Sequence, residues 1–213
     1  MFDLPSSNRL PVEHLNACFN DVTTSYKFYW FLSILELIKE GNSPVIPLDR
    51  LLANMLANVW YPTRYFYLSF GKQDRLSQLT EEIQSESGLS IDSRKQKVVE
   101  TILVHLSKNS SVGREIRNLE RYVPYRFLRP FFNKELERKP DWQINDLIVK
   151  LTEQGFATKT SPVLYRFIGN GSSIEIHEDW FAYLQEHLFI LTGFCLWHLL
   201  NYIQRNNPNV PNI

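Results

Sequence analysis

The chain has 213 residues, of which 23 are basic and 23 acidic, and it is 44% hydrophobic and 14% aromatic. This composition excludes an intrinsically disordered chain, because disordered segments are poor in aromatic residues. The zero net charge excludes attraction of the whole molecule to nucleic acid or an acidic membrane, so any such attraction has to be local. The only two cysteines, Cys18 and Cys195, predict free buried thiols in a reducing cytoplasm rather than a disulfide framework.

Two apolar stretches, Tyr26–Ile38 and Leu188–Ile203, are shorter than the roughly 20 apolar residues that cross a bilayer as a helix. The second stretch also contains His198 and Asn201. Both therefore predict core helices, and the N-terminus lacks the apolar core of a secretory signal. We expect a cytoplasmic protein that has no membrane partner.

Apolar residues at helical spacing, with caps before them and Gly or Pro after them, predict five helices in the first half of the chain. They are expected over 11–19, 26–39, 48–61, 74–85 and 93–107. The aromatic stretch YFYLSFGK after Pro62 is expected to be extended or irregular.

The second half adds a helix after Pro140, an alternating pattern around Gly169–Ser172 that predicts a β-hairpin, and a long final helix that begins near Glu178. The predicted fold class is mainly α, a multi-helix globular domain with one late β-hairpin. A helix followed by a hairpin also resembles the end of a winged helix, whose wing can lie against a DNA backbone. Its charge would come from Lys150, Lys159 and Arg166, and ordinary packing of a helix on a hairpin is the alternative.

Changes in composition along the chain divide it into four expected segments. They are an N-terminal helical subdomain over 1–110, a basic-aromatic connecting segment over 111–140, a helix, hairpin and long helix over 141–206, and the start of a linker over 207–213.

Motifs that would mark an enzyme are missing from the sequence. The five His residues are scattered, and none forms HExxH or a Cys/His cluster. GxSxG, GxGxxG and P-loop patterns do not occur either. We interpret His177, Glu178 and Asp179 as a helix cap rather than a metal site, and we expect no catalytic residue, metal or cofactor in this chain.

The connecting segment is rich in arginine. Arg114, Arg117 and Arg121 are spaced i, i+3 and i+7, so one helix would place them on one face. Arg126 and Arg129 continue the basic stretch. Cations on one face can pair with phosphates, and neighbouring tyrosines offer stacking surfaces, so we expect these five arginines to bind nucleic acid. A solvated helix face paired to Glu115 and Glu120 is the alternative.

Four stretches of the chain carry a further signal: HLNACFNDVTTSYKFYWFLSILELI, LLANMLANVWYPTRYFYLSFGKQDRL, YVPYRFLRPFF, and EDWFAYLQEHLFILTGFCLWHLLNYIQRNNPNVPNI. Read together, from about residue 10 to residue 213, they resemble the N-terminal region of bacterial HNH endonuclease domain proteins. The resemblance implies that NPNVPNI leads through a basic linker into an HNH domain. There a His would activate water, and a divalent cation would stabilise charge on the cleaved phosphate. None of that segment lies in this chain, so no catalytic residue is carried over.

The function expected from this resemblance is a non-catalytic module that positions an HNH-type nuclease on nucleic acid, with DNA as the partner. Bacterial proteins of this build often act in phage defence. The alternative is a protein-interaction or dimerisation scaffold that recruits or regulates the nuclease, bound to a protein partner or to a second copy. This alternative predicts an exposed apolar patch near Trp60–Phe70, because aromatic residues are enriched at interfaces.

Overall fold

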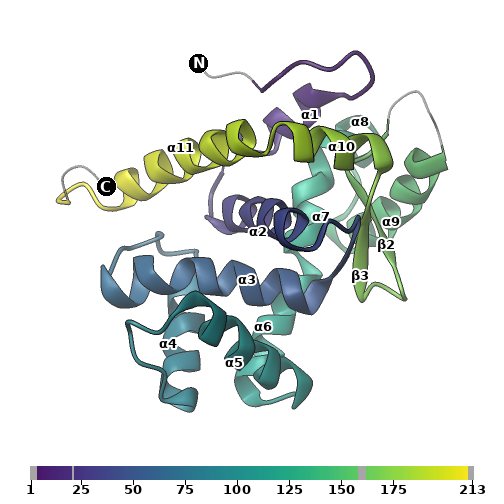
Figure 1. The fold of residues 1–213 in the computed structure, drawn as a ribbon. Coiled ribbons are helices and arrows are strands. Elements are labelled where there is room, and N and C mark those ends of the chain that lie inside the picture. Colours follow the sequence, from purple (N-terminus) through teal and green to yellow (C-terminus); the bar gives the residue numbers. More distant parts are fainter. Residues whose placement is uncertain (1–3, 21, 158–161, 211–213) are drawn as a thin grey trace.

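The computed structural model describes residues 4–20, 22–157 and 162–210 of the chain. It is mainly α-helical with one small antiparallel sheet, which confirms the predicted fold class. Helix α2 (Tyr26–Gly41) lies between α3 (Leu48–Trp60) and α11 (Leu188–Asn206), and α3 packs in turn against α5 (Lys95–Ser107). Figure 1 shows these layers, with α11 on the outside.

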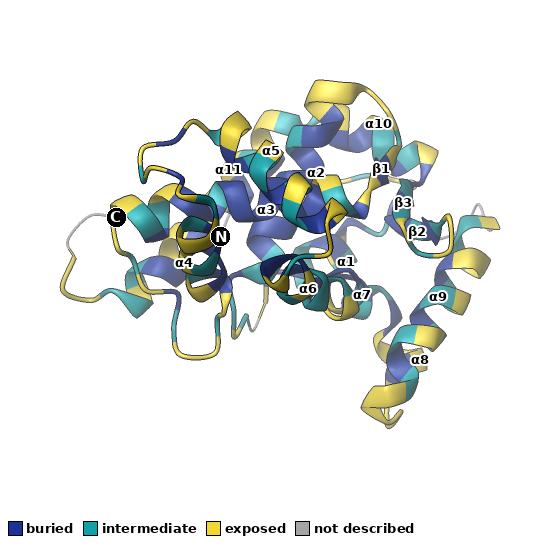
Figure 2. Cartoon of the chain, turned by 90° about the horizontal axis from the view of Figure 1, so that it is seen from below, coloured by how far each residue is buried: buried dark blue, intermediate teal, exposed yellow. Residues whose placement is uncertain are grey.

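The central position of α2 follows from its sequence, YKFYWFLSILELIKEG, which is apolar on all sides. All residues from Phe28 to Leu35 are buried, as are Leu37 and Ile38. The helix ends at Asn42, which adopts a left-handed conformation with a φ of 46° and donates its N–H to the Ile38 carbonyl. In Figure 2, buried residues dominate α2 and α3.

Seven further helices of the described residues surround this stack. They are α1 (Val12–Ala17), α4 (Leu76–Ser87), α6 (Ser111–Asn118), α7 (Val123–Leu128), α8 (Asn133–Leu136), α9 (Asp141–Ala157) and α10 (Glu178–Glu186). Two 3₁₀ turns, η2 (Leu119–Arg121) and η3 (Arg129–Phe132), flank α7. Among the residues that the structure describes, no helix is both long enough and apolar enough to span a bilayer.

The end of helix α3 differs from the prediction, whereas residues 66–72 are irregular, as expected. The chain does not leave the helix at Pro62, because Tyr61–Tyr65 continues it as a π-helical turn, η1. Pro62 has no N–H to donate to the preceding turn, and the hydrogen bond from the Phe66 N–H to the Tyr61 carbonyl spans five residues. The Thr63 hydroxyl contacts the Val59 carbonyl at 2.8 Å.

The sheet has three strands, β1 (Val45–Pro47), β2 (Tyr165–Ile168) and β3 (Ser173–Ile176), in the order β1-β3-β2. Strands β2 and β3 form the predicted hairpin, and its turn contains three consecutive residues with positive φ, at positions 169–171. Strand β1 was not expected, because three residues carry too little pattern to predict a strand. It pairs antiparallel with β3 and places Ile46 opposite Ile174.

Buried side chains from Leu4 to Ile203 form one hydrophobic cluster. The segments expected over 1–110, 111–140 and 141–206 therefore share a core. The first residue of the expected linker over 207–213 is also attached to the folded body. The Asn207 side chain accepts from the Ser69 N–H at 2.8 Å and donates to the Ser69 carbonyl at 2.7 Å.

The two cysteines are free and buried, as the sequence predicts. The Cys18 thiol donates to the Phe127 carbonyl at 3.0 Å. Burial raises the pKa of Cys18 to about 12 and also raises the pKa of Cys195. Both thiols are therefore poor nucleophiles in the folded chain.

One buried hydroxyl joins three elements of the fold. The Tyr165 hydroxyl on β2 accepts from the Trp30 indole N–H of α2 at 3.2 Å and donates to the Pro124 carbonyl of α7 at 2.6 Å. Removing this hydroxyl would leave the Trp30 N–H and the Pro124 carbonyl buried without a hydrogen-bond partner. Such a loss costs more free energy than the loss of a hydrogen bond at the surface.

We expect Tyr165→Phe to lower the free energy of unfolding by about 2 kcal/mol, because Trp30 and Pro124 both lose their partner. Urea unfolding followed by tryptophan fluorescence measures this change. Tyr67→Phe is the matched control, because the Tyr67 side chain is exposed, and its effect should stay within about 0.5 kcal/mol. Equal effects of the two substitutions would refute the structural role of Tyr165.

His198 on α11 should make stability depend on pH. The centre of its ring lies 4.5 Å from that of Phe194 and 6.2 Å from that of Phe19. Burial lowers the pKa of His198 below the usual 6.5, and the positive charge of Arg205 makes a smaller contribution in the same direction. As pH falls, His198 is therefore protonated at a higher pH in the unfolded chain than in the folded chain. The free energy of unfolding decreases as pH falls below 6.5, and this decrease ends once pH is below the lowered pKa of the folded chain. The difference between the pH profiles of the native chain and His198→Gln isolates this contribution. Parallel profiles would contradict it.

Candidate functional site

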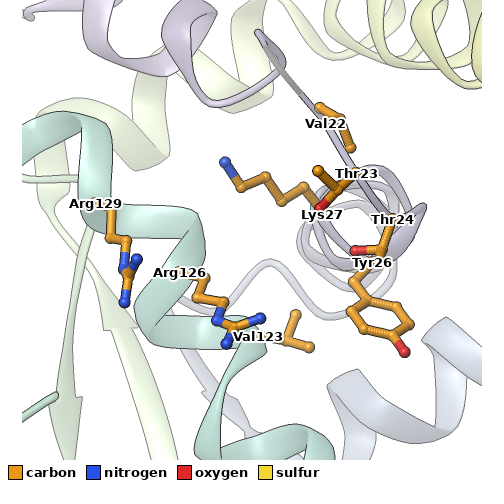
Figure 3. Close-up of a pocket in the computed structure, with 8 residues that line it drawn as sticks. All are labelled: Val22, Thr23, Thr24, Tyr26, Lys27, Val123, Arg126 and Arg129. Atoms are coloured by element: carbon orange, nitrogen blue, oxygen red, sulfur yellow. The ribbon is translucent and has the colours of Figure 1, made fainter. Parts of the chain in front are cut away.

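A surface groove lies between the start of α2 and the segment formed by α7 and η3, and we call it the basic groove. Its first hollow has a volume of about 220 Å³. The lining residues are Val22, Thr23, Thr24, Tyr26, Lys27, Val123, Arg126 and Arg129. Figure 3 shows Lys27 extending from α2 toward the wall that carries Arg126 and Arg129.

The basic groove continues into a second hollow of about 260 Å³, which shares Thr23, Thr24, Tyr26 and Arg126 with the first. Arg75, Glu115 and Tyr122 are among the residues that the second hollow adds. Each hollow is smaller than the roughly 300 Å³ at which small-molecule pockets begin. The shape therefore suits contact with an extended ligand better than enclosure of a small one.

Two prolines shape the side of the groove formed by α7 and η3, which carries Arg126 and Arg129. Pro124 and Pro130 stand in the first turns of α7 and η3, where a missing N–H costs nothing. Arg126 and Arg129 lie three residues apart across this junction and line the same hollow.

Asp74 fixes the opposite wall at the start of α2. Its carboxylate accepts from the Ser25 N–H at 2.7 Å, the Ser25 hydroxyl at 2.6 Å and the Leu76 N–H at 3.0 Å. It thereby ties the first turns of α2 and α4 together. Burial raises the pKa of Asp74, although these hydrogen bonds act in the opposite direction. The Tyr26 hydroxyl accepts from the Arg75 N–H at 2.8 Å, so Tyr26 is held at the same junction.

Cations outnumber carboxylates along the basic groove. Among the described residues that line it, four are basic, Lys27, Arg75, Arg126 and Arg129, and one is acidic, Glu115, which lies 3.4 Å from Arg75. The Arg126 guanidinium lies 5.1 Å from the centre of the Tyr122 ring. This excess of positive charge beside an aromatic ring suits a phosphate-bearing ligand with flat bases.

Arg129 is only loosely held. It contacts Asp141 at 3.2 Å, but the Asp141 side chain is 92% exposed, and exposed ion pairs of this kind contribute little. The Arg129 Nε is buried and has no hydrogen-bond partner in the described part of the chain. A ligand anion would therefore compete with only one weak contact.

The structure separates the five predicted arginines. Arg117 does not face the groove, because it pairs with Asp49 at 3.0 and 3.2 Å and with Glu120 at 2.9 Å. Arg114 donates to the Asn109 carbonyl at 2.8 Å. Arg121 is exposed, and its side chain has no hydrogen bond or ion pair within the described ranges.

The reason for this separation is a break in the helix. Helix α6 ends at Asn118, and a 3₁₀ turn follows through Arg121. The expected i, i+3, i+7 face requires one continuous α-helix, so the spacing does not bring the three side chains together.

The helix and hairpin that resemble a winged helix carry little free positive charge. Arg166 pairs with Glu175 at 2.7 Å and Glu153 at 3.3 Å, and the hydrogen bond to Glu175 raises the pKa of Arg166. Lys150 is exposed on α9, and Lys159 lies outside the described residues. The carboxylates around Arg166 disfavour contact between this hairpin and a DNA backbone.

The sequence analysis missed the wall that α2 and its neighbours contribute. Thr23, Tyr26, Lys27 and Arg75 precede Arg126 by 50 residues or more, and none lies in a basic cluster. The only local signal is the Thr-Thr-Ser run, which predicts a helix start and says nothing about the residues across the groove.

Among the described residues, no group of three or more His, Cys, Asp and Glu side chains is arranged to hold a metal ion. His177 caps α10, as predicted, because its Nδ1 accepts from the Asp179 N–H at 3.2 Å. Fold and site together define a mainly α-helical protein with a basic surface groove. Comparison with protein-family models, curated proteins and solved structures gives no match for this chain. The HNH-family resemblance therefore stays a prediction.

Proposed function

We propose that the chain is a nucleic-acid-binding module that contacts the phosphate backbone through the basic groove. The observation that carries this proposal is the convergence of Lys27, Arg126 and Arg129 from two walls on one hollow. Lys27 precedes Arg126 by 99 positions and Arg129 by more. The fold therefore creates this cluster, and a local run of basic residues does not.

Two further features support binding of a strand with accessible bases. Tyr122 is exposed beside Arg126, and aromatic rings next to cations act as stacking platforms for single strands. The Thr23 and Thr24 side chains line both hollows and supply hydroxyl groups, which commonly bond to phosphate oxygens.

In this proposal the chain supplies binding, and cleavage belongs to an HNH domain that the sequence resemblance implies. DNA is the expected ligand. The module would hold the strand so that a water-activating His and a divalent cation of that domain reach a phosphate.

The alternative, a protein-interaction or dimerisation scaffold, rests on apolar surface. The side chains of Tyr61, Tyr65, Phe66 and Tyr67 are exposed in the region where the sequence predicts such a patch. These residues do not line the basic groove, so a protein contact there is compatible with nucleic-acid binding.

We expect the double variant Arg126→Gln/Arg129→Gln to bind a fluorescein-labelled oligonucleotide more weakly than the native chain. The slope of log affinity against log salt should shrink by roughly 1 to 2, because each lost phosphate contact removes about 0.7 to 0.9. Fluorescence anisotropy titrations between about 50 and 200 mM salt measure both the affinity and its salt slope. Single- and double-stranded oligonucleotides are titrated in parallel.

The charge-matched control is Lys97→Gln/Lys108→Gln, which removes two exposed cations from α5 and its C-cap. This control should leave affinity and slope unchanged. Equal losses in the two double variants would show that binding depends on diffuse charge and not on the basic groove. A native chain that binds neither oligonucleotide at low salt would overturn the proposal.

A further inference from the structure

Helix α11 is mostly apolar from Leu188 to Leu200, but the described residues cover only one of its faces. Leu191, Phe194, Cys195 and Leu199 are buried toward the core. The outward face is exposed at Phe189 (83%), Ile190 (54%), Leu196 (41%), Trp197 (55%) and Leu200 (41%). Figure 1 places α11 at the outside of the helical layers. We call these five residues, together with Gly193, the α11 stripe.

The α11 stripe has the spacing of a helix–helix seam. Positions 189, 193, 196 and 200 recur at intervals of four, three and four residues, as seam positions do in paired helices. Ile190 and Trp197 flank this line, seven residues apart. No acidic residue, lysine or arginine occurs from Leu188 to Gln204, so α11 itself places no charge in the seam. From α2, the Lys39 Nζ lies 5.9 Å from the centre of the Phe189 ring, at one end of the stripe.

The area of the stripe is large enough for a dimer. Its exposed side chains present roughly 600 Å² of apolar surface, given that a large aromatic side chain has 150–250 Å² to bury. Monomeric proteins rarely expose contiguous apolar patches beyond a few hundred Å². Two copies joined through this face would bury about 1,200 Å² in total, above the roughly 1,000 Å² that a specific interface needs.

We propose that α11 pairs with α11 of a second copy in an antiparallel, two-fold symmetric dimer. An antiparallel crossing centred near position 195 places Trp197 of one copy against Gly193 of the other. A side chain added at Gly193 would meet nothing within 4 Å, so that position offers space for an indole ring. The same crossing places Ile190 against Leu200, so the stripe is complementary to itself, as a two-fold interface requires.

The charges at the two ends of the stripe favour the antiparallel direction. Glu186, the last residue of α10, lies two residues before the start of α11, Arg205 lies in the last turn of α11, and both are exposed. Antiparallel pairing brings Glu186 of one copy toward Arg205 of the other, whereas parallel pairing would bring like charges together. A membrane surface fits less well, because helices that bind membranes flank their apolar face with Lys and Arg.

Sedimentation velocity of the full chain at roughly 1 to 100 µM tests the dimer, since interfaces at the lower end of the size range are often weak. We expect a concentration-dependent monomer–dimer equilibrium. Phe189→Gln/Leu200→Gln should raise the dissociation constant by about 100-fold or more, because it places amides in the seam. Tyr65→Gln/Phe66→Gln, which replaces two exposed aromatic residues elsewhere, is the matched control and should leave the constant unchanged.

A monomer at every concentration, or a dimer disrupted only by Tyr65→Gln/Phe66→Gln, would overturn the proposal. A monomer that pellets with phosphatidylcholine vesicles would assign the α11 stripe to a lipid surface and overturn it equally. Circular dichroism of each variant separates loss of association from loss of folding. No nucleic acid enters these measurements, so their failure is distinguishable from failure of the proposed binding function.

The antiparallel register has its own test. Gly193→Trp should fill the space that Trp197 of the other copy occupies, and Trp197→Ala should leave that space empty, so each raises the dissociation constant. The double variant Gly193→Trp/Trp197→Ala exchanges the large and small positions. It should dimerise about tenfold more tightly than Gly193→Trp alone, which corresponds to about 1.4 kcal/mol. A double variant no tighter than that single variant would refute this register.

Discussion

The buried Tyr165 hydroxyl is the contact on which the arrangement of the remaining elements depends. It joins the late hairpin to α2 and α7 through Trp30 and Pro124, which are far apart in the sequence. The same α2–α7 junction is filled by Phe31 and Phe127, whose rings stack at 5.7 Å and 17°. Because the basic groove has α2 as one wall and α7 with η3 as the other, this buried junction also sets the width of a surface site. A polar contact in the core thus determines where cations on the surface can meet.

Helices α2 and α11 are both strongly apolar in sequence, but the fold buries them to different extents. Helix α2 is enclosed, because α3, α7, α10 and α11 all pack against it. Helix α11 supplies one of these covering layers, so only its inner face is buried. A chain of 213 residues builds one such core, and the outermost apolar helix then keeps an apolar face in solvent unless something else covers it. The α11 stripe is therefore exposed because α2, and not α11, occupies the centre of the helical layers.

Local sequence pattern predicted most of the long helices and the hairpin, because spacing, caps and turn residues act within a few positions. The single final helix expected from Glu178 onward is instead two helices, α10 and α11, separated at His187. The pattern did not predict β1, whose three residues pair with Ser173–Glu175, about 130 positions later. Nor did it show which arginines stay available for a ligand. Arg117 is taken by Asp49, 68 positions earlier, while Arg126 and Arg129 meet Lys27, about 100 positions earlier. Availability of a charged side chain depends on partners that only the folded chain brings close, so a run of arginines in the sequence overstates the binding surface.

The α11 helix connects the two surfaces that carry the proposals. On its inner face the Tyr202 hydroxyl lies 3.2 Å from the Thr23 carbonyl, and Thr23 lines both hollows of the basic groove. On its outer face lies the α11 stripe. A dimer formed through that stripe would therefore hold two basic grooves in a fixed relation. Two linked sites on one strand bind more tightly than either alone, provided that the strand can reach both. Weak binding by each groove would then suffice for firm attachment of the pair.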